Sequence, residues 1–215
     1  MTLYALLSDV HGRGDRLARV LADAQRCGAD VFVALGDIAG VHALALLDEV
    51  GATCVFGNWE ASGFRGLPPP YRGWVRRWPA QVKLDGFIAA HASPVWPARL
   101  EVAGVVEYLR TRGLHWTALF PSLLHSEEAR RQALAELEAA DLALFFHGHT
   151  HTQDAWCSRS GHAPERVPGG RGGIEIAAGE RWLVGVGSVG NPHDGPGACY
   201  ALYDAEARRV TWRRV

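Results

Sequence analysis

The sequence has little of several features, and each scarcity excludes a class of protein. Only four of its 215 residues are cysteine and none forms a CxxC pair, so we expect four buried thiols, no reliance on disulfides and a cytoplasmic location. A net charge of −1 supplies no field for a nucleic-acid groove or an anionic membrane. Because the first apolar run is short and lacks a basic flank, neither a signal peptide nor a transmembrane helix is expected.

Short apolar runs alternate with helical patterns over the first sixty residues, which indicates a mainly parallel sheet covered by helices. The expected strands are Leu3–Leu7, Val31–Leu35 and Thr53–Phe56, and the expected helices are Gly14–Cys27 and Val41–Val50. Later strands are expected at Leu142–Phe146, Ile174–Ala177, Trp182–Val186, Ala198–Tyr203 and Val210–Arg213, the last four forming a second sheet. The predicted fold class is therefore α/β: two mixed β-sheets in a sandwich flanked by helices.

Two insertions interrupt this pattern in what we expect to be one domain spanning residues 1–215. Residues 61–80 contain three consecutive prolines and are expected to be irregular. The aromatic and arginine residues of Phe64–Trp78 either stack a base and clamp phosphate or pack against the sheet. Residues 98–140 are expected to contain helices over Arg99–Arg110 and Ser126–Ala140, the second with Ser126 as its N-cap.

Two further local patterns are readable between and after these insertions. A hairpin is expected from Gln81 to His91, with Asp85-Gly86 as its tight turn. A glycine-rich loop is expected over Pro168–Gly173.

Polar residues cluster where predicted strands end, which is the edge at which open α/β sheets bind ligands. The cluster is Asp9-x-His11, Gly36-Asp37, Gly57-Asn58, His91 and Gly148-His149-Thr150-His151. Its imidazole, carboxylate and amide groups suit Mn, Fe or Zn. Seven ligands are too many for one ion, but they suit a two-metal site in which one carboxylate bridges. His147 is left out of the set as a core or supporting histidine.

The order of these motifs resembles that of the calcineurin-like metallophosphoesterases: DxH, GD, GN(H)(D/E), a lone His and GHxH. Gly187–Gly195 is similar to the GSVG(Q)P(R)DG loop of the small bacterial and archaeal phosphodiesterase branch. The resemblance implies a four-layer metallophosphoesterase-like fold and two divalent ions, with Mn expected first and Fe, Zn or Ni as alternatives. It assigns Asp9, His11, Asp37 and His151 to one ion and Asp37, Asn58, His91 and His149 to the other, bridged by Asp37.

The implied activity is hydrolysis of a small phosphate ester, nucleotide-like or other, through attack by metal-bound hydroxide. A phosphodiester is expected before a monoester. The expected catalytic residues are Asp37, Asn58 and His193, and the expected substrate contacts are Gly187, Ser188 and Asn191. The alternative for the glycine-rich segment at 187–191 is a tight turn.

One position departs from the family pattern, because Trp59 stands where many members have histidine. An indole cannot protonate a leaving oxygen, so the enzyme either favours esters that depart unaided or uses another acid such as His193. A serine/threonine protein phosphatase or dinucleoside polyphosphate hydrolase stays open as an alternative, although those relatives usually keep the histidine. A non-catalytic metal-binding scaffold is a further alternative, although the complete ligand set disfavours it. A homo-oligomer also stays open.

Overall fold

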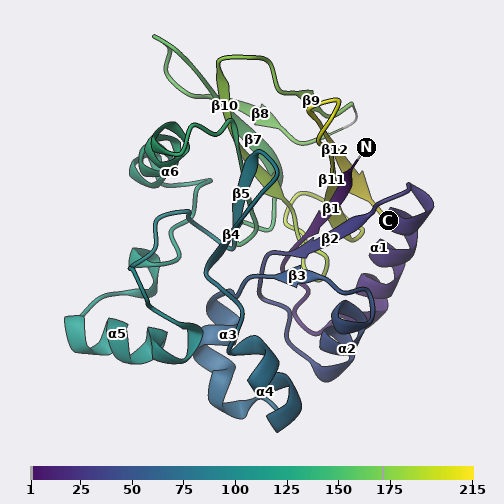
Figure 1. The fold of residues 1–215 in the computed structure, drawn as a ribbon, viewed down its shortest axis with the longest axis vertical. Coiled ribbons are helices and arrows are strands. Elements are labelled where there is room, and N and C mark those ends of the chain that lie inside the picture. The colour runs from purple at the N-terminus through teal and green to yellow at the C-terminus, as the bar shows by residue number, and fades with distance from the viewer. Residues whose placement is uncertain (1, 171) are drawn as a thin grey trace.

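A computed structural model describes residues 2–170 and 172–215, and two six-stranded β-sheets face each other in this part of the chain (Figure 1). The first sheet has the order β3-β2-β1-β11-β12-β9. Its strands are β1 (Leu3–Leu7), β2 (Val31–Ala34), β3 (Thr53–Cys54), β9 (Ile174–Glu175), β11 (Cys199–Asp204) and β12 (Arg209–Arg214). The second sheet has the order β4-β5-β6-β10-β7-β8. Its strands are β4 (Gln81–Leu84), β5 (Phe87–Ala90), β6 (Leu144–His147), β7 (Gln153–Arg159), β8 (Glu165–Pro168) and β10 (Glu180–Val186).

Both sheets are mixed, which confirms the predicted fold class. The assignment of strands to the two sheets differs from the prediction. Among the four late strands expected in a second sheet, only β10 lies there, parallel to β6. Strand β11 pairs antiparallel with β1, and it brings β12 and β9 into the first sheet. Side-chain alternation identifies a strand locally, whereas its neighbour is chosen by contacts far along the chain. The hairpin β7–β8 was not predicted.

Helices cover the outer face of each sheet and complete the four layers (Figure 1). Helices α1 (Gly14–Arg26) and α2 (Val41–Glu49) pack on the first sheet, and α6 (Glu127–Ala139) packs on the second. As predicted, Ser126 caps α6, because its hydroxyl accepts a hydrogen bond from the backbone N–H of Ala129 at 3.1 Å.

The core between the sheets explains why β1 is apolar throughout rather than alternating. Tyr4 and Leu6 point into the inter-sheet core, while Ala5 and Leu7 point into the core beneath α1 and α2. A strand buried on both faces is expected to have no polar side. This burial fixes the strand whose carboxyl end carries Asp9.

The first insertion contains more helix than its composition suggested, whereas the first helix of the second insertion starts later than expected. Residues expected to be irregular form α3 (Asn58–Gly63), a 3₁₀ turn at Phe64–Gly66 and α4 (Pro69–Val75). Proline is tolerated in α4 because the first turn of a helix needs no N–H donor there. The helix expected from Arg99 starts only with a 3₁₀ turn at Val102–Gly104, followed by α5 (Val105–Arg112), because Arg99 has a φ of +64°.

Of the expected glycine-rich loop, residue 171 lies outside the described residues. No helix in the described ranges is long and apolar enough to cross a membrane.

Candidate metal centre

The candidate ligands lie on loops that leave the carboxyl ends of neighbouring strands and meet at one edge of the two sheets. Their backbone is unusual. Nine non-glycine residues in the described chain have a positive φ, and five of them are candidate ligands: Asp9, His11, Asp37, His149 and His151. Such conformations cost about 1–3 kcal/mol each and persist where the surroundings enforce them, often at functional sites.

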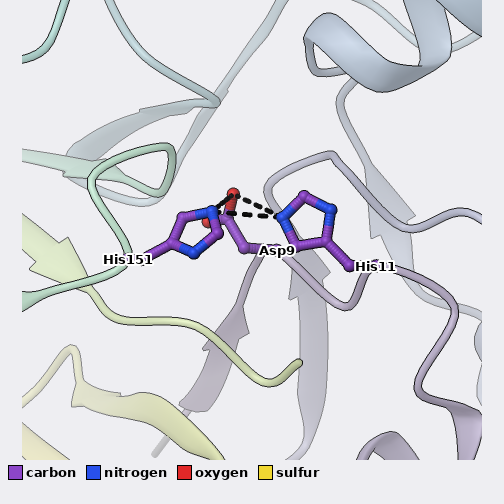
Figure 2. A group of neighbouring side chains, drawn as sticks. All are labelled: Asp9, His11 and His151. Carbon is purple, nitrogen blue, oxygen red and sulfur yellow. Dashed lines mark hydrogen bonds and ion pairs between the residues drawn. The ribbon is translucent and has the colours of Figure 1, made fainter. Parts of the chain in front are cut away.

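The first ligand group consists of Asp9, His11 and His151 (Figure 2). The Nε2 atoms of the two histidines face each other at 3.1 Å, and Oδ1 of Asp9 lies 3.2 Å from His151 Nε2 and 3.7 Å from His11 Nε2. Oδ1 of Asp9 is buried and accepts no well-formed hydrogen bond from any described residue. Its other oxygen accepts the backbone N–H of His149 at 2.9 Å. An orphaned carboxylate oxygen between two imidazole nitrogens fits a divalent cation.

The second group is built around His91, whose side chain is 1% exposed. Its Nδ1 lies 2.7 Å from the carbonyl of Leu35, which orients the ring so that Nε2 points into the site. That Nε2 lies 3.5 Å from Asp37 Oδ1, 3.0 Å from Asn58 Oδ1 and 3.2 Å from His149 Nδ1. Imidazole, carboxylate and amide atoms therefore converge here as in the first group.

The two groups are close enough to share carboxylates. Asp9 belongs to both sets of mutually close ligand atoms, with His11 and His151 in one and with Asp37 and His91 in the other. The structure thus brings together all seven residues that the sequence predicted.

The pKa values of the candidate ligands reflect their burial and the charges around them. Burial raises the pKa of Asp37 to about 6, and the charges of Glu60 and Asp9 add to this rise. Burial also acts to raise the pKa of Asp9, but the neighbouring imidazoles of His11 and His151 hold it well below its usual range. Burial, and then the charge of His91, lower the pKa of His149 to about 3. Neutral His149 therefore has a nitrogen lone pair available for a metal.

Glu60 has a structural role that sequence reasoning did not assign. Its carboxylate is almost fully buried and accepts the backbone N–H groups of Asp37, Ile38 and Gly57, each at 2.8 Å. It thus ties the loop after β2 to the loop after β3. The available signal was its place as the acidic residue of the GN(H)(D/E) pattern.

Two glycines let the ligand loops approach closely. A Cβ on Gly148 would collide with the Ser8 hydroxyl and lie 2.7 Å from Asp9 Oδ2. A Cβ on Gly57 would overlap the carboxylate of Asp37. Glycine in the GH and GN motifs is therefore a packing requirement of the site.

The predicted substrate contacts divide into buried and exposed residues. Ser188 is fully buried, where its hydroxyl donates to the carbonyl of Asp9 at 2.8 Å and accepts from the backbone N–H of Asn191 at 2.8 Å. Gly187 is also buried and has a φ of +81°. Asn191 and His193 are exposed, and the His193 ring stacks on His151 with centroids 4.6 Å apart.

A cleft of about 600 Å³ opens over the ligands. It is lined by His11, Arg13, Asp37, Asn58, Trp59, His149, His151, Gly190, Asn191 and His193. Arg13, which the sequence analysis did not single out, is a half-exposed cation in this lining and suits an anionic substrate.

Two other predictions concern residues near the site. His147 is buried beside Phe145 and is in neither ligand group found among the described residues, as expected of a supporting histidine. In the Phe64–Trp78 segment, Trp78 is 5% exposed and packs edge-on against Trp74 beneath the first sheet. The burial of Trp78 favours the packing interpretation, although Arg76, Arg77 and Trp78 also line a surface pocket.

Comparison with known proteins places this geometry in a family. Residues 1–208 match the calcineurin-like phosphoesterase superfamily domain. The chain therefore belongs to the calcineurin-like phosphoesterase superfamily, as the motifs predicted, and it is a hydrolase of phosphate esters. A search of curated proteins finds no match.

Solved structures confirm the fold over the whole chain. A metallophosphoesterase from Sphaerobacter thermophilus is 24% identical, with a TM-score of 0.70, and the alignment covers 100% of this chain and 88% of that one. Hypothetical protein PH1004 from Pyrococcus horikoshii OT3 is 14% identical, with a TM-score of 0.63 and coverage of 100% and 88%. An archaeal phosphodiesterase is 9% identical, with a TM-score of 0.54 and coverage of 100% of both chains.

Proposed function

We propose that the protein is a dinuclear metal-dependent phosphodiesterase that hydrolyses small, nucleotide-like phosphate esters. The observation that carries this proposal is the pair of ligand groups on one cleft floor, which meet at buried carboxylates. When bound, two divalent cations supply charge neutralisation and activation of a water molecule. Manganese is the first expectation for both ions, because the ligands are imidazole, carboxylate and amide atoms without sulfur.

Each residue has a distinct task in this proposal. Asp9, His11, Asp37 and His151 hold one ion, and Asp37, Asn58, His91 and His149 hold the other. Asp37 would be shared by both ions, as the family resemblance implies, and Asp9, the carboxylate that both ligand groups contain, lies beside it. Gly187 and Ser188 act on the substrate only indirectly, since Ser188 holds the backbone of Asn191 beside the cleft.

The chain supplies positioning and proton transfer around the ester. Arg13 and Asn191 line the cleft where the phosphoryl oxygens would lie. We assign the proton-donor role to His193, since it borders the cleft on the side of His151 and Trp59 has no transferable proton of suitable acidity. His193→Gln should therefore slow hydrolysis of esters with poor leaving groups by about 100-fold or more, and leave good leaving groups less affected.

The diester preference is supported by the archaeal phosphodiesterase among the structural neighbours and by the absence of histidine at Trp59. The four cysteines are free, which supports a reducing compartment such as the cytoplasm. Three of them are buried, but Cys27 is only partly buried, so the expectation of four buried thiols was wrong at that position. One domain over residues 1–215 remains our proposal for the organisation of the chain.

The deciding experiment uses metal-stripped protein, to which Mn²⁺ is added back while bound metal is quantified. Hydrolysis of bis(p-nitrophenyl) phosphate should appear as occupancy approaches about two ions per chain and exceed that of p-nitrophenyl phosphate. Asp37→Asn should lower both occupancy and turnover, the latter by at least about 100-fold, while exposed Asp48→Asn on α2 should change neither. Full occupancy without turnover of either ester would favour the scaffold alternative, and faster monoester hydrolysis would contradict the diesterase.

A further inference from the structure

A second, smaller cavity of about 290 Å³ adjoins the metal cleft. Its aromatic walls are Trp59, Trp116 and Phe120, and we call it the aromatic pocket. Asn58, Trp59 and His149 line both the aromatic pocket and the cleft, so the two cavities meet at two candidate metal ligands. A substrate whose ester group lies over the candidate metal ligands could therefore place one of its substituents in the aromatic pocket.

Trp59 is placed unlike a tryptophan that serves the core. Its side chain is 50% exposed, whereas Trp78, Trp182 and Trp212 are at most 8% exposed. One edge is fixed against the His11 ring, with centroids 4.6 Å apart and an interplanar angle of 67°. Its backbone N–H donates to Oδ1 of Asp37 at 2.8 Å, which fixes where α3 begins relative to the site. An exposed indole face that contacts His11 along one edge is suited to stacking on a planar ligand.

The other aromatic residues of the lining come from the helical insertion. Phe120 is buried against His149 and His91, with ring centroids 6.4 Å and 6.0 Å away. Trp116 lies next to it at 5.7 Å and is only partly buried. The lining also includes the hydroxyl-bearing side chains of Ser62 and Thr117. The aromatic pocket thus combines three aromatic rings with hydroxyl, amide and imidazole groups that suit the polar edge of a heteroaromatic ring.

We infer that the aromatic pocket binds a single planar aromatic group, such as a nucleobase, carried by one ester substituent of the substrate. This inference rests on the proposed function and narrows its substrate class. Trp59 thereby acts as a specificity-determining residue through stacking, in a position where relatives have a proton donor. The size of the cavity, at the small end for ligand pockets, selects one ring system rather than a polynucleotide or a protein segment.

The first test measures binding without metal or turnover. Adenosine is titrated into metal-stripped protein by calorimetry, with ribose as the control ligand. Adenosine should bind and ribose should not, and Trp59→Ala should weaken adenosine binding by about 5- to 150-fold, the effect of losing one stacking partner. Trp59→Phe should retain most of the affinity because it keeps a ring, and Trp156→Phe, remote on the α6 face, should match the wild type.

The second test uses the Mn²⁺-loaded enzyme and competitive inhibition of bis(p-nitrophenyl) phosphate hydrolysis. AMP should inhibit more strongly than ribose 5-phosphate by a similar factor, and Trp59→Ala should bring the two inhibition constants together. Equal binding of adenosine and ribose, or unchanged adenosine binding in folded Trp59→Ala, would overturn the inference. Adenosine binding without ester hydrolysis would instead support the aromatic pocket and refute the phosphodiesterase proposal.

Discussion

Replacing Glu60 by glutamine tests whether one buried carboxylate holds the ligand loops together. In the wild type, Oε2 accepts the N–H groups of Asp37 and Gly57, and Oε1 accepts that of Ile38. A glutamine can present only one oxygen, so its NH₂ group must face at least one N–H donor. One charge-assisted hydrogen bond is lost, and the other two lose their charge.

The magnitude follows from these three bonds. Losing the first costs about 2 kcal/mol, and neutralising the acceptor of the other two costs about 0.5–1 kcal/mol each, so unfolding should become easier by about 3–4 kcal/mol. Urea denaturation of the metal-stripped protein measures this directly. The control is Glu128→Gln, an exposed residue of α6 paired with Arg131, which should change stability by less than about 1 kcal/mol.

Calorimetric titration with Mn²⁺ gives a second readout of the same change. Since Glu60 fixes the backbone of Asp37, Glu60→Gln should also weaken metal binding by about 10- to 100-fold, the range seen for residues that orient metal ligands. A loss of stability below about 1 kcal/mol together with unchanged metal affinity would refute the reasoning.

Three further changes have directions that follow from the structure. Buried Asp23 accepts hydrogen bonds from Tyr200 at 2.6 Å and Arg213 at 2.9 Å, so Asp23→Asn should destabilise the fold by about 1–3 kcal/mol in urea titrations at pH 7. Burial acts to raise the pKa of Asp23, but these partners lower it below its usual value. Their stabilisation of the fold is therefore complete above the unfolded pKa of about 4 and is lost as the pH falls through the pKa of the folded state. A difference in unfolding free energy between wild type and Asp23→Asn that widens below pH 4 would contradict this. Gly148→Ala should cost about 1–3 kcal/mol and impair Mn²⁺ binding because its Cβ meets Ser8, whereas Gly66→Ala, which has open space, should be neutral in both assays. Chelating the metal should lower the Tm by about 5–10 °C for each ion bound, relative to protein at 100 times its Kd for Mn²⁺. An unchanged melting curve would argue against a metal-stabilised site.

The candidate ligands were predictable because each is encoded beside its own strand. Asp9 follows β1, His91 follows β5 and His149 follows β6, and parallel strands bring their carboxyl ends to one edge. The helix cap at Ser126 and the turn at Asp85-Gly86 were predictable for the same reason, since both depend on a few adjacent residues.

Sheet membership and the aromatic pocket could not be predicted in this way. Strand β11 joins β1 across nearly the whole chain, and no local pattern distinguishes that partner from β10. Trp59 and Trp116 meet at one cavity although 57 positions separate them, and Glu60 bonds to Asp37 across 23. The sequence alone determined the types and order of the candidate metal ligands, because those depend on local strand ends. Only the tertiary structure decided what surrounds them, because strand pairing and cavity walls depend on long-range packing.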